Sequence, residues 1–358
     1  MRDIQEPYQL FDDPFRYYAA MLDDIEAARE SILLETYRMR NDTIGVKFRD
    51  VLTEKAKKGV KVKILLDSWG SGGISENFFL DFTKAGGEFR FFEKIKFNFD
   101  FFTRSHRRNH RKLLIIDNHI SYLGSSNLTD YNLNWRELVI RIKGEIADVF
   151  RKVFNQDFRI YNKYVFDKVR FTRMLKFEDF EIIRDVPSIT LKRISKRYIQ
   201  LIKNARKKIF IETPYFLPGF LIRKALSDAA KRGVKVSVHI PKHSDVGLVD
   251  ILRNKYLGPL YKSGVRFRYY MPHNLHAKAM LVDDEIFSIS SANFDYRSFR
   301  YMHEIAFIGR DPRIIIQLTD HMAKTMQNCE EFSYEVWQNR PKINKFFEWL
   351  LLPFRHLL

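Results

Sequence analysis

Two stretches of the chain carry the same polar residues in the same order. They are His110, Lys112, Asp117 and Asn127 in residues 109–127, and His276, Lys278, Asp283 and Asn293 in residues 275–293. Packing does not require polar identities to recur at fixed intervals, so the repetition indicates chemistry. An imidazole can attack phosphorus or transfer protons near neutral pH, while ammonium and amide groups can hold phosphate oxygens. The paired set favours phosphoryl chemistry without a metal.

Each imidazole needs a carboxylate that holds it in one tautomer. Glu137 and Glu304 follow the two histidines at matching places and are the candidates. On a strand, residues two apart project from the same side, so each histidine faces the same way as its lysine. Asp117 and Asp283 have the opposite parity, and we expect them to support the motif from behind.

The repetition extends into the surrounding chain. Residues 28–67 align with 205–241, 84–92 with 262–270, and 135–142 with 302–309. Each half contains apolar runs typical of buried strands, a helix between the first two of them, and a motif hairpin. The sequence therefore predicts an α/β fold of two duplicated halves. We expect mixed sheets flanked by helices, packed as a pseudo-twofold pair with one shared active site.

The predicted domain organisation has four parts. They are an N-terminal half (1–160), a connecting segment (161–190), a C-terminal half (191–330) and an apolar C-terminal tail (331–358). No apolar run approaches the roughly 20 residues of a spanning helix, and the N-terminus has no signal-peptide pattern. The tail, with Trp349 near its centre, has two interpretations: a segment lying on a membrane surface, or a terminal helix docked on the core.

Composition restricts the partners. The chain has 62 Lys and Arg against 44 Asp and Glu, a formal net charge of +18, which favours nucleic acid or an anionic membrane. A single cysteine, Cys329, excludes an internal disulfide framework and a cysteine-rich zinc site, and it fits a reducing compartment.

A basic and aromatic loop, residues 93–111, immediately precedes His110. Its phenylalanines are Phe97, Phe99, Phe101 and Phe102. A rim of this composition can insert Phe side chains among acyl chains while Lys and Arg meet lipid phosphates. The alternative is a solvated loop whose phenylalanines pack inward.

The pattern H-x-K-x4-D-x6-[GS]-S-x-N, present twice, resembles the phospholipase D superfamily. Within it, "ETPYFLPGFLIRKALSDAAKRGVKV" (212–236) and "SSANFDYRSFRYMHEIAFI" are similar to short-type bacterial cardiolipin synthases. The resemblance implies two phospholipase D-like halves and a phosphatidyltransferase that makes cardiolipin from phosphatidylglycerol, without a cofactor or metal. It also implies a phosphatidyl-histidine intermediate on His110, with His276 as the acid and base.

The resemblance also implies further roles. Glu137 and Glu304 would orient the histidines, and the phosphate would be held by Lys112, Lys278, Asn127, Asn293, Ser125 and Ser291. Tyr215, in "YFLPG", either borders an acyl-binding cleft or serves packing alone. The expected partners are anionic phospholipid and the membrane surface, not nucleic acid, with the protein peripheral on the cytoplasmic side of the cell membrane.

Two other functions remain open at this point. One is a phosphodiesterase that hydrolyses phospholipid or nucleic acid, since the sequence does not say whether water or an alcohol resolves the intermediate. The other is a non-catalytic basic scaffold that binds membranes. Neither the exact lipids nor the oligomeric state follows from the sequence.

Overall fold

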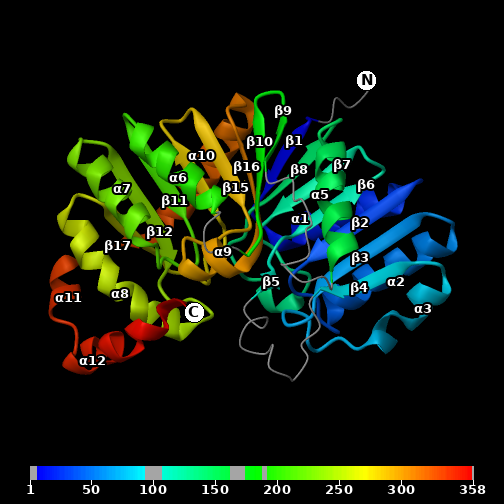
Figure 1. The fold of residues 1–358 in the computed structure, drawn as a ribbon, viewed down its shortest axis with the longest axis horizontal. Helices are drawn as coiled ribbons and strands as arrows, with labels where there is room; N and C mark the ends of the chain where they lie inside the picture. The colour runs from blue at the N-terminus through cyan, green and yellow to red at the C-terminus, as the bar shows by residue number, and fades with distance from the viewer. Residues whose placement is uncertain (1–5, 93–106, 162–173, 188–191, 357–358) are drawn as a thin grey trace.

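The computed structural model describes residues 6–92, 107–161, 174–187 and 192–356. The chain folds into two α/β halves that lie side by side (Figure 1). The elements of the first half are β1 (Tyr8–Phe11), α1 (Pro14–Ala27), β2 (Ser31–Thr36), α2 (Thr43–Lys57), β3 (Lys61–Asp67), η1 (Glu76–Phe79), α3 (Leu80–Lys84), β4 (Glu88–Phe92), β5 (Arg108–Asn109), β6 (Leu113–Ile116), β7 (Ile120–Gly124), η2 (Asp130–Asn132), β8 (Val139–Lys143) and α5 (Ala147–Ile160).

The second half repeats this order and continues beyond it. Its elements are β9 (Met174–Phe177), β10 (Phe180–Asp185), α6 (Arg193–Asn204), β11 (Lys208–Glu212), α7 (Phe220–Lys231), β12 (Lys235–Pro241), α8 (Gly247–Lys262), β13 (Arg266–Tyr270), β14 (Ala279–Val282), β15 (Ile286–Ser290), α9 (Tyr296–Tyr301), β16 (Met302–Gly309), α10 (Pro312–Gln327), β17 (Cys329–Glu331), α11 (Tyr334–Gln338), α12 (Lys342–Leu351) and η3 (Leu352–His356).

Each half is built on a mixed sheet. The first sheet has the order β1-β8-β7-β6-β2-β3-β4, and the second has the order β17-β13-β12-β11-β14-β15-β16-β10-β9. In both, three parallel strands continue into antiparallel strands that include the motif hairpin. The predicted fold class, two duplicated halves with mixed sheets, is confirmed.

The second half begins earlier in the chain than the sequence suggests. Residues 174–185, within the expected connecting segment 161–190, form the hairpin β9–β10, and β10 pairs antiparallel with β16. The strand β10 has the position that β1 has beside β8 in the first sheet. The sequence does not reveal this strand, because β10 (FEIIRD) is short and does not repeat the residues of β1 (YQLF).

Helix α2 shows how local sequence sets the element boundaries. The Asp42 side chain caps its start by accepting the Gly45 backbone N–H at 2.9 Å, and Phe48 and Leu52 face the core. Just beyond its end, Gly59 has φ = +83°, a conformation that glycine adopts without strain. The chain then enters β3, whose carboxyl end reaches the active-site side of the sheet.

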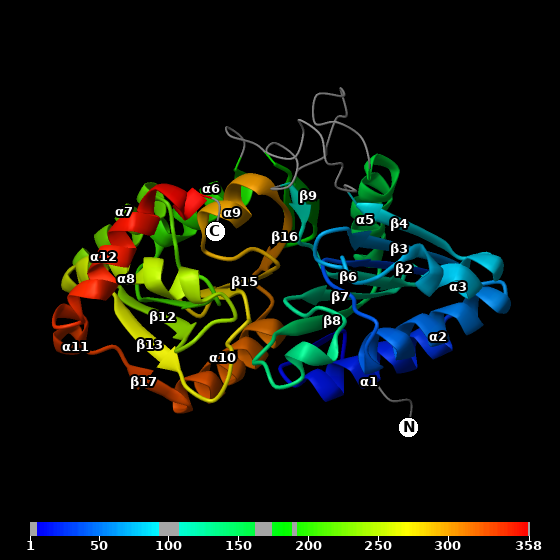
Figure 2. The ribbon, with the colours of Figure 1, turned by 90° about the horizontal axis from the view of Figure 1, so that it is seen from below.

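The two halves share a core. Apolar residues of both sheets pack together with α5 and α10, whereas α1–α3 cover the other face of the first sheet and α6–α8 that of the second (Figure 2). Strand β5 of the first half pairs in parallel with β16 of the second. The boundary between the halves is therefore both packed and hydrogen-bonded.

The C-terminal tail lies on the second half. Helix α12 contacts α8, and its inward-facing Glu348 accepts the Arg340 guanidinium at 2.7 and 2.8 Å. Its outward residues are exposed: Ile343, Phe346, Phe347, Trp349 and Leu350. The tail is thus docked on the protein and also presents an apolar outer face. Among the residues described, no helix has the length and apolar character needed to cross a membrane.

Candidate active site

The two motif histidines lie in one cavity between the halves. The cavity has a volume of about 240 Å³. Residues of the first half in its lining are Tyr37, Arg38, Trp69, His110, Asn127 and Trp135; polar residues of the second half are Tyr215, Asp245, His276, Asn293, Asp295, Arg297 and Ser298. The site is shared between the halves, as predicted.

The histidines are not on the strands where the sequence pattern puts them. Strand β6 begins at Leu113 and β14 at Ala279, so each His–Lys pair precedes its strand. This part of the chain pairs with the opposite half instead. The His110 backbone N–H donates to the His303 carbonyl at 3.0 Å, and that of His276 donates to the Arg136 carbonyl at 2.8 Å.

The glutamates are exchanged between the halves. His110 Nδ1 lies 3.1 Å from Glu304 Oε1, and His276 Nδ1 lies 2.9 Å from Glu137 Oε2. Both carboxylates are fully buried. The sequence predicts both glutamates as the partners of the histidines, but it does not reveal that each one serves the histidine of the other half.

The surroundings of His110 define its tautomer. Its Nδ1 lies 3.0 Å from the Ser291 carbonyl oxygen, which can only accept, as well as near the Glu304 carboxylate. The proton is therefore on Nδ1, and Nε2 carries a free lone pair. For His276 the ionised Glu137 carboxylate accepts the Nδ1 proton and has the same orienting effect.

The two motif serines do not contact the cavity as expected. The hydroxyl of Ser125 donates to the Glu137 carboxylate, and that of Ser291 donates to the Glu304 carboxylate. Both hydroxyls also accept a backbone N–H, at 2.9 and 3.0 Å, and both residues are fully buried. The expectation that they bind phosphate is replaced by a role in holding the glutamates.

The motif lysines are buried beside the histidines. Lys112 Nζ donates to the His110 carbonyl at 2.6 Å, and Lys278 Nζ donates to the His276 carbonyl at 2.8 Å. Burial, together with the charge of Lys278, lowers the pKa of Lys112 well below its ordinary value. Burial lowers the pKa of Lys278 to about 8. Because the charge of Lys278 acts on Lys112, an anion bound beside them would favour the protonated form of both lysines.

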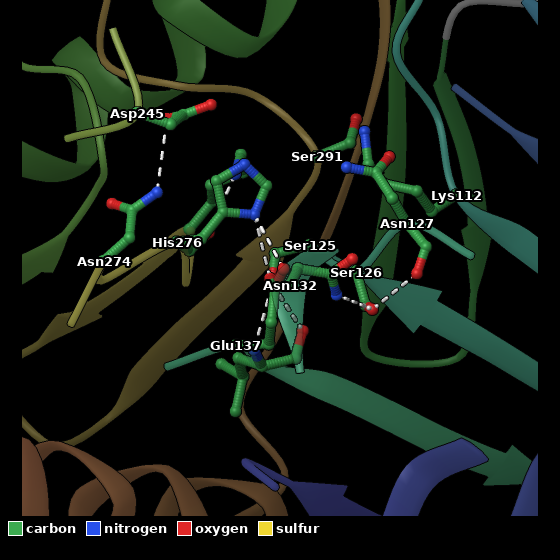
Figure 3. A network of polar contacts seen from close by, with 12 residues as sticks. Lys112, Ser125, Ser126, Asn127, Asn132, Glu137, Asp245, Asn274, His276 and Ser291 are labelled. Atoms are coloured by element: carbon green, nitrogen blue, oxygen red, sulfur yellow. Dashed lines mark hydrogen bonds and ion pairs between the residues drawn. The ribbon is translucent and has the colours of Figure 1, made fainter. Parts of the chain in front are cut away.

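The asparagines face the cavity. Asn127 and Asn293 belong to its lining, and the side-chain oxygen of each lacks a hydrogen-bond partner within the described part of the chain. An amide oxygen only accepts, so the missing bond at each would come from an N–H or O–H group of a ligand. Figure 3 shows Asn127 beside Lys112, on the side of His276 away from Asp245.

The motif aspartates lie away from the cavity, at the hairpin turns. The Asp117 carboxylate accepts the backbone N–H groups of residues 29–31 at 2.7–2.9 Å, and Asp283 accepts those of residues 206–208 at the same distances. Both have positive φ, +48° and +56°. They tie each hairpin to the start of the neighbouring strand, β2 or β11. This agrees with the support role that strand parity predicts.

The two His–Glu pairs differ electrostatically. Burial, reinforced by Lys112 and Lys278, lowers the pKa of His110 well below its ordinary value, while burial raises the pKa of Glu304 to about 8. Burial alone raises the pKa of Glu137, but His276 and Lys278 outweigh it and leave this pKa below normal.

The pKa of His276 is also lowered by burial, and Glu137 counteracts part of that effect. The His276 pair therefore carries more charge than the His110 pair.

The expected membrane contacts have different outcomes. Phe97, Phe99, Phe101 and Phe102 lie outside the described residues. Trp349 is on α12 and 69% exposed, whereas Tyr215 lines the cavity and donates its hydroxyl to Asp245 at 2.7 Å.

The sequence analysis did not identify several polar or aromatic cavity residues, among them Arg38, Trp135, Asp245 and Arg297. Arg38 and Asp245 stand just beyond the carboxyl ends of β2 and β12, where open α/β sheets bind ligands, and this position is the signal that identifies them. Within the described residues, no group of three or more His, Cys, Asp or Glu side chains is arranged to hold a metal ion.

Comparisons with known proteins agree with this geometry. Residues 21–158 and 198–326 match the family model described as "Cardiolipin synthase, PLD-like domain". The chain is 33% identical over 353 residues to cardiolipin synthase 1 of Staphylococcus epidermidis, covering 95% of this chain and 72% of that protein. It is 32% identical over 339 residues to the major cardiolipin synthase ClsA of Bacillus subtilis, covering 90% and 70%.

A solved structure shares the fold. Phosphatidylserine synthase of Haemophilus influenzae superposes with a TM-score of 0.77 over 99% of this chain and 96% of that chain, at 14% identity. At this identity the likeness shows the arrangement of the two halves and nothing about the substrate.

Proposed function

The chain belongs to the cardiolipin synthase family of phospholipase D-like proteins, and on this premise we propose that it transfers a phosphatidyl group between two phosphatidylglycerol molecules through a phosphatidyl-histidine. The observation that carries the proposal is the pair of His–Glu contacts made across the boundary of the halves, around one cavity. Two oriented imidazoles flanked by two lysines are what a double displacement at phosphorus requires.

In the first step, His110 Nε2 attacks the phosphorus of one phosphatidylglycerol. The P–O bond to the headgroup glycerol breaks, and His276 gives its proton to the departing alkoxide. Lys112 and Lys278 offset the charge that builds on the non-bridging oxygens. The products of this step are phosphatidyl-His110 and free glycerol.

In the second step, neutral His276 removes the proton from a glycerol hydroxyl of a second phosphatidylglycerol. The resulting oxygen attacks phosphorus, the P–N bond to His110 breaks, and cardiolipin leaves. His276 keeps this proton and can act as the acid in the next cycle. His110 Nε2 recovers its lone pair when the P–N bond breaks. One molecule of glycerol is released for each cardiolipin formed.

The electrostatics support this assignment of the two histidines. A nucleophile must be unprotonated, and the pKa of His110 is lowered well below normal by burial and by two lysines. A general acid must carry a proton; burial lowers the pKa of His276, but the Glu137 carboxylate beside it counteracts part of that effect and favours the protonated imidazole. In this proposal Asn127 and Asn293 join the lysines by donating side-chain N–H groups to the phosphate oxygens.

The protein acts on lipids at a membrane, and we propose that it does so peripherally, from the cytoplasmic side. The net charge of +18 supports attraction to an anionic surface. The apolar outer face of α12, with exposed Phe346 and Trp349, supports insertion at the headgroup level. Leu248 is also exposed and lies between two residues of the cavity lining, Val246 and Val249, which puts an exposed apolar side chain next to the site.

Phosphatidylglycerol vesicles and mass spectrometry test the proposal. We expect cardiolipin and glycerol in equal amounts, with no more than traces of phosphatidic acid. Phosphatidic acid as the main product would instead show that water resolves the intermediate, making the protein a phospholipase. Cleavage of DNA or RNA with no lipid turnover would favour a nuclease, and liposome binding without turnover would favour a scaffold.

A further inference from the structure

One carboxylate stands apart in a cavity that is otherwise rich in cations. Of the residues that line it, only Asp245 and Asp295 are acidic. The Asp295 side chain caps α9 by accepting the Ser298 backbone N–H at 2.6 Å. Asp245 is the acidic group that remains for a ligand.

Two neighbours hold the Asp245 carboxylate in place. Tyr215 donates its hydroxyl to Oδ1 at 2.7 Å, and Asn274 donates its side-chain N–H to the same oxygen at 3.2 Å. Within the described part of the chain, Oδ2 has no recorded hydrogen-bond donor. The carboxylate is therefore oriented through one oxygen, which leaves the other for a ligand.

The carboxylate lies on the His276 side of the site. Asn274 is two residues before His276 in the chain, and Figure 3 shows the Asp245–Asn274 pair beside His276, opposite Lys112 and Asn127. Among the described residues of the first half, none in the cavity lining is acidic. The residues that follow β3 contribute Trp69 to the lining, and Asp67 is buried against backbone N–H groups, including that of Asn109 at 2.8 Å.

The chemistry of the two steps identifies what would occupy this place. The alcohol that leaves and the alcohol that enters must both reach the histidine that serves as acid and then as base. In the proposed reaction both alcohols are glycerol headgroups, with hydroxyls beyond the one that reacts. A carboxylate accepts hydrogen bonds from such hydroxyls strongly. An ammonium headgroup suits the site less, because it would approach Lys278 as well.

We propose that Asp245, oriented by Tyr215 and Asn274, binds the non-reacting hydroxyls of the glycerol headgroup beside His276. This inference rests on the proposed function and adds a determinant of which acceptor is used. By holding a polyol where water would otherwise attack, Asp245 favours transfer over hydrolysis.

A competition between two acceptors tests this role. The enzyme is given phosphatidylglycerol vesicles with deuterated glycerol and 1-propanol at equal concentrations, and labelled phosphatidylglycerol and phosphatidylpropanol are counted by mass spectrometry. We expect the wild type to prefer glycerol. In Asp245→Asn the ratio of glycerol to propanol products should fall about 10-fold, because a charge-assisted bond becomes a neutral one. The share of phosphatidic acid should rise.

The competition separates binding from a general electrostatic effect. If the carboxylate acted only through its field on His276, transfer to both alcohols would slow equally. An unchanged ratio of products in Asp245→Asn would therefore overturn the proposal. Asp228→Asn, on the exposed side of α7 and paired with Lys224 at 2.7 Å, is the matched control and should keep the wild-type ratio. A fall in this control would also count against the proposal.

One further variant and one further acceptor complete the test. Tyr215→Phe keeps the carboxylate but removes its orientation, and we expect a smaller fall in the same direction; this variant decides the matter if Asp245→Asn does not fold. Ethanolamine in place of propanol must be used less than glycerol, and a preference for it would show that the site binds an ammonium group. Failure of the wild type to transfer to any alcohol would refute the proposed function itself.

Discussion

The two halves build nearly the same histidine–glutamate contact, yet its surroundings differ. The Nδ1–carboxylate distances are 3.1 Å for His110 and 2.9 Å for His276. Beside His110 the Glu304 carboxyl has a pKa raised by burial to about 8, so it is largely neutral at pH 7, whereas Glu137 beside His276 is ionised. Duplication thus kept the geometry and let the charge of the two pairs diverge.

This difference assigns different tasks to the two histidines. His110 is oriented by the Ser291 carbonyl as well as by a carboxyl, so its tautomer does not depend on an ionised partner. Among the described residues, His276 has Glu137 as its hydrogen-bond partner for the same purpose. The first pair suits a nucleophile that attacks as a neutral imidazole, and the second suits a group that gains and loses a proton.

Removing the nucleophile has the largest expected effect. His110→Ala should lower the rate of cardiolipin formation by at least about 10⁴-fold, since no other group forms the covalent intermediate. Mass spectrometry of the intact protein should find a phosphatidyl adduct in the wild type and none in this variant. An adduct on His276 in His110→Ala would reverse the assignment.

Removing the acid should have a smaller effect that depends on the leaving group. We expect His276→Ala to slow the reaction by about 10²- to 10⁴-fold with phosphatidylglycerol. A phosphatidyl ester of p-nitrophenol, which leaves without protonation, should recover most of the first step and accumulate the adduct on His110. Equal losses with both substrates would mean that His276 is not the acid.

The glutamates give the most direct comparison of the halves. Glu137→Gln should reduce the rate by about 10²-fold, because a neutral amide no longer favours the Nδ1-protonated, charged state of His276. Glu304→Gln should cost less than about 10-fold, since it resembles the neutral carboxyl and His110 keeps its bond to a carbonyl. Steady-state rates at pH 7 measure both, and equal losses would contradict the division of roles.

The same two variants should differ in how stability depends on pH. The folded pKa of Glu304 is raised from 4.5 to about 8, so the folded state binds an extra proton between these values. Its contribution to the free energy of unfolding is present below pH 4.5 and falls by about 1.4 kcal/mol per pH unit as pH rises towards 8. Glu304→Gln should escape this loss and gain relative to the wild type.

The contribution of Glu137 to stability depends on pH with the opposite sign. Its pKa is lowered in the fold, so its contribution is present above pH 4.5 and is lost as pH falls further. Urea denaturation between pH 5 and pH 8 should show a difference from the wild type that changes with pH for Glu304→Gln and stays constant for Glu137→Gln. If the difference from the wild type changed with pH in the same way for both variants, the pKa values of the two carboxyls would not differ as described.

Much of this site follows from the residues themselves, because the duplication compares the chain with itself. Recurrence of the His–Lys–Asp–Asn set identified the hairpins, and the matching positions of Glu137 and Glu304 identified the partners of the histidines. Strand parity put Asp117 and Asp283 behind the site, where they bind backbone N–H groups. These inferences concern residues close in sequence or repeated in it.

What could not be predicted depends on how the halves pack. The exchange of glutamates requires contacts between residues 137 and 276 and between 110 and 304, and no local pattern encodes which half supplies which group. The motif serines were misjudged because a hydroxyl near a phosphate site can bond to a carboxylate as readily. Asp245 escaped notice since the matching loop, after β3, contributes Trp69 to the cavity in place of a carboxylate.

The exchange of glutamates also affects when the protein can become active during its synthesis. Residues near the N-terminus leave the ribosome first, and domains fold largely in that order. A nascent chain that has folded only its first half contains His110 but not Glu304. It also lacks the cavity residues that the second half contributes. We therefore expect transferase activity to arise only after the chain has been made beyond Glu304 and the two halves have docked.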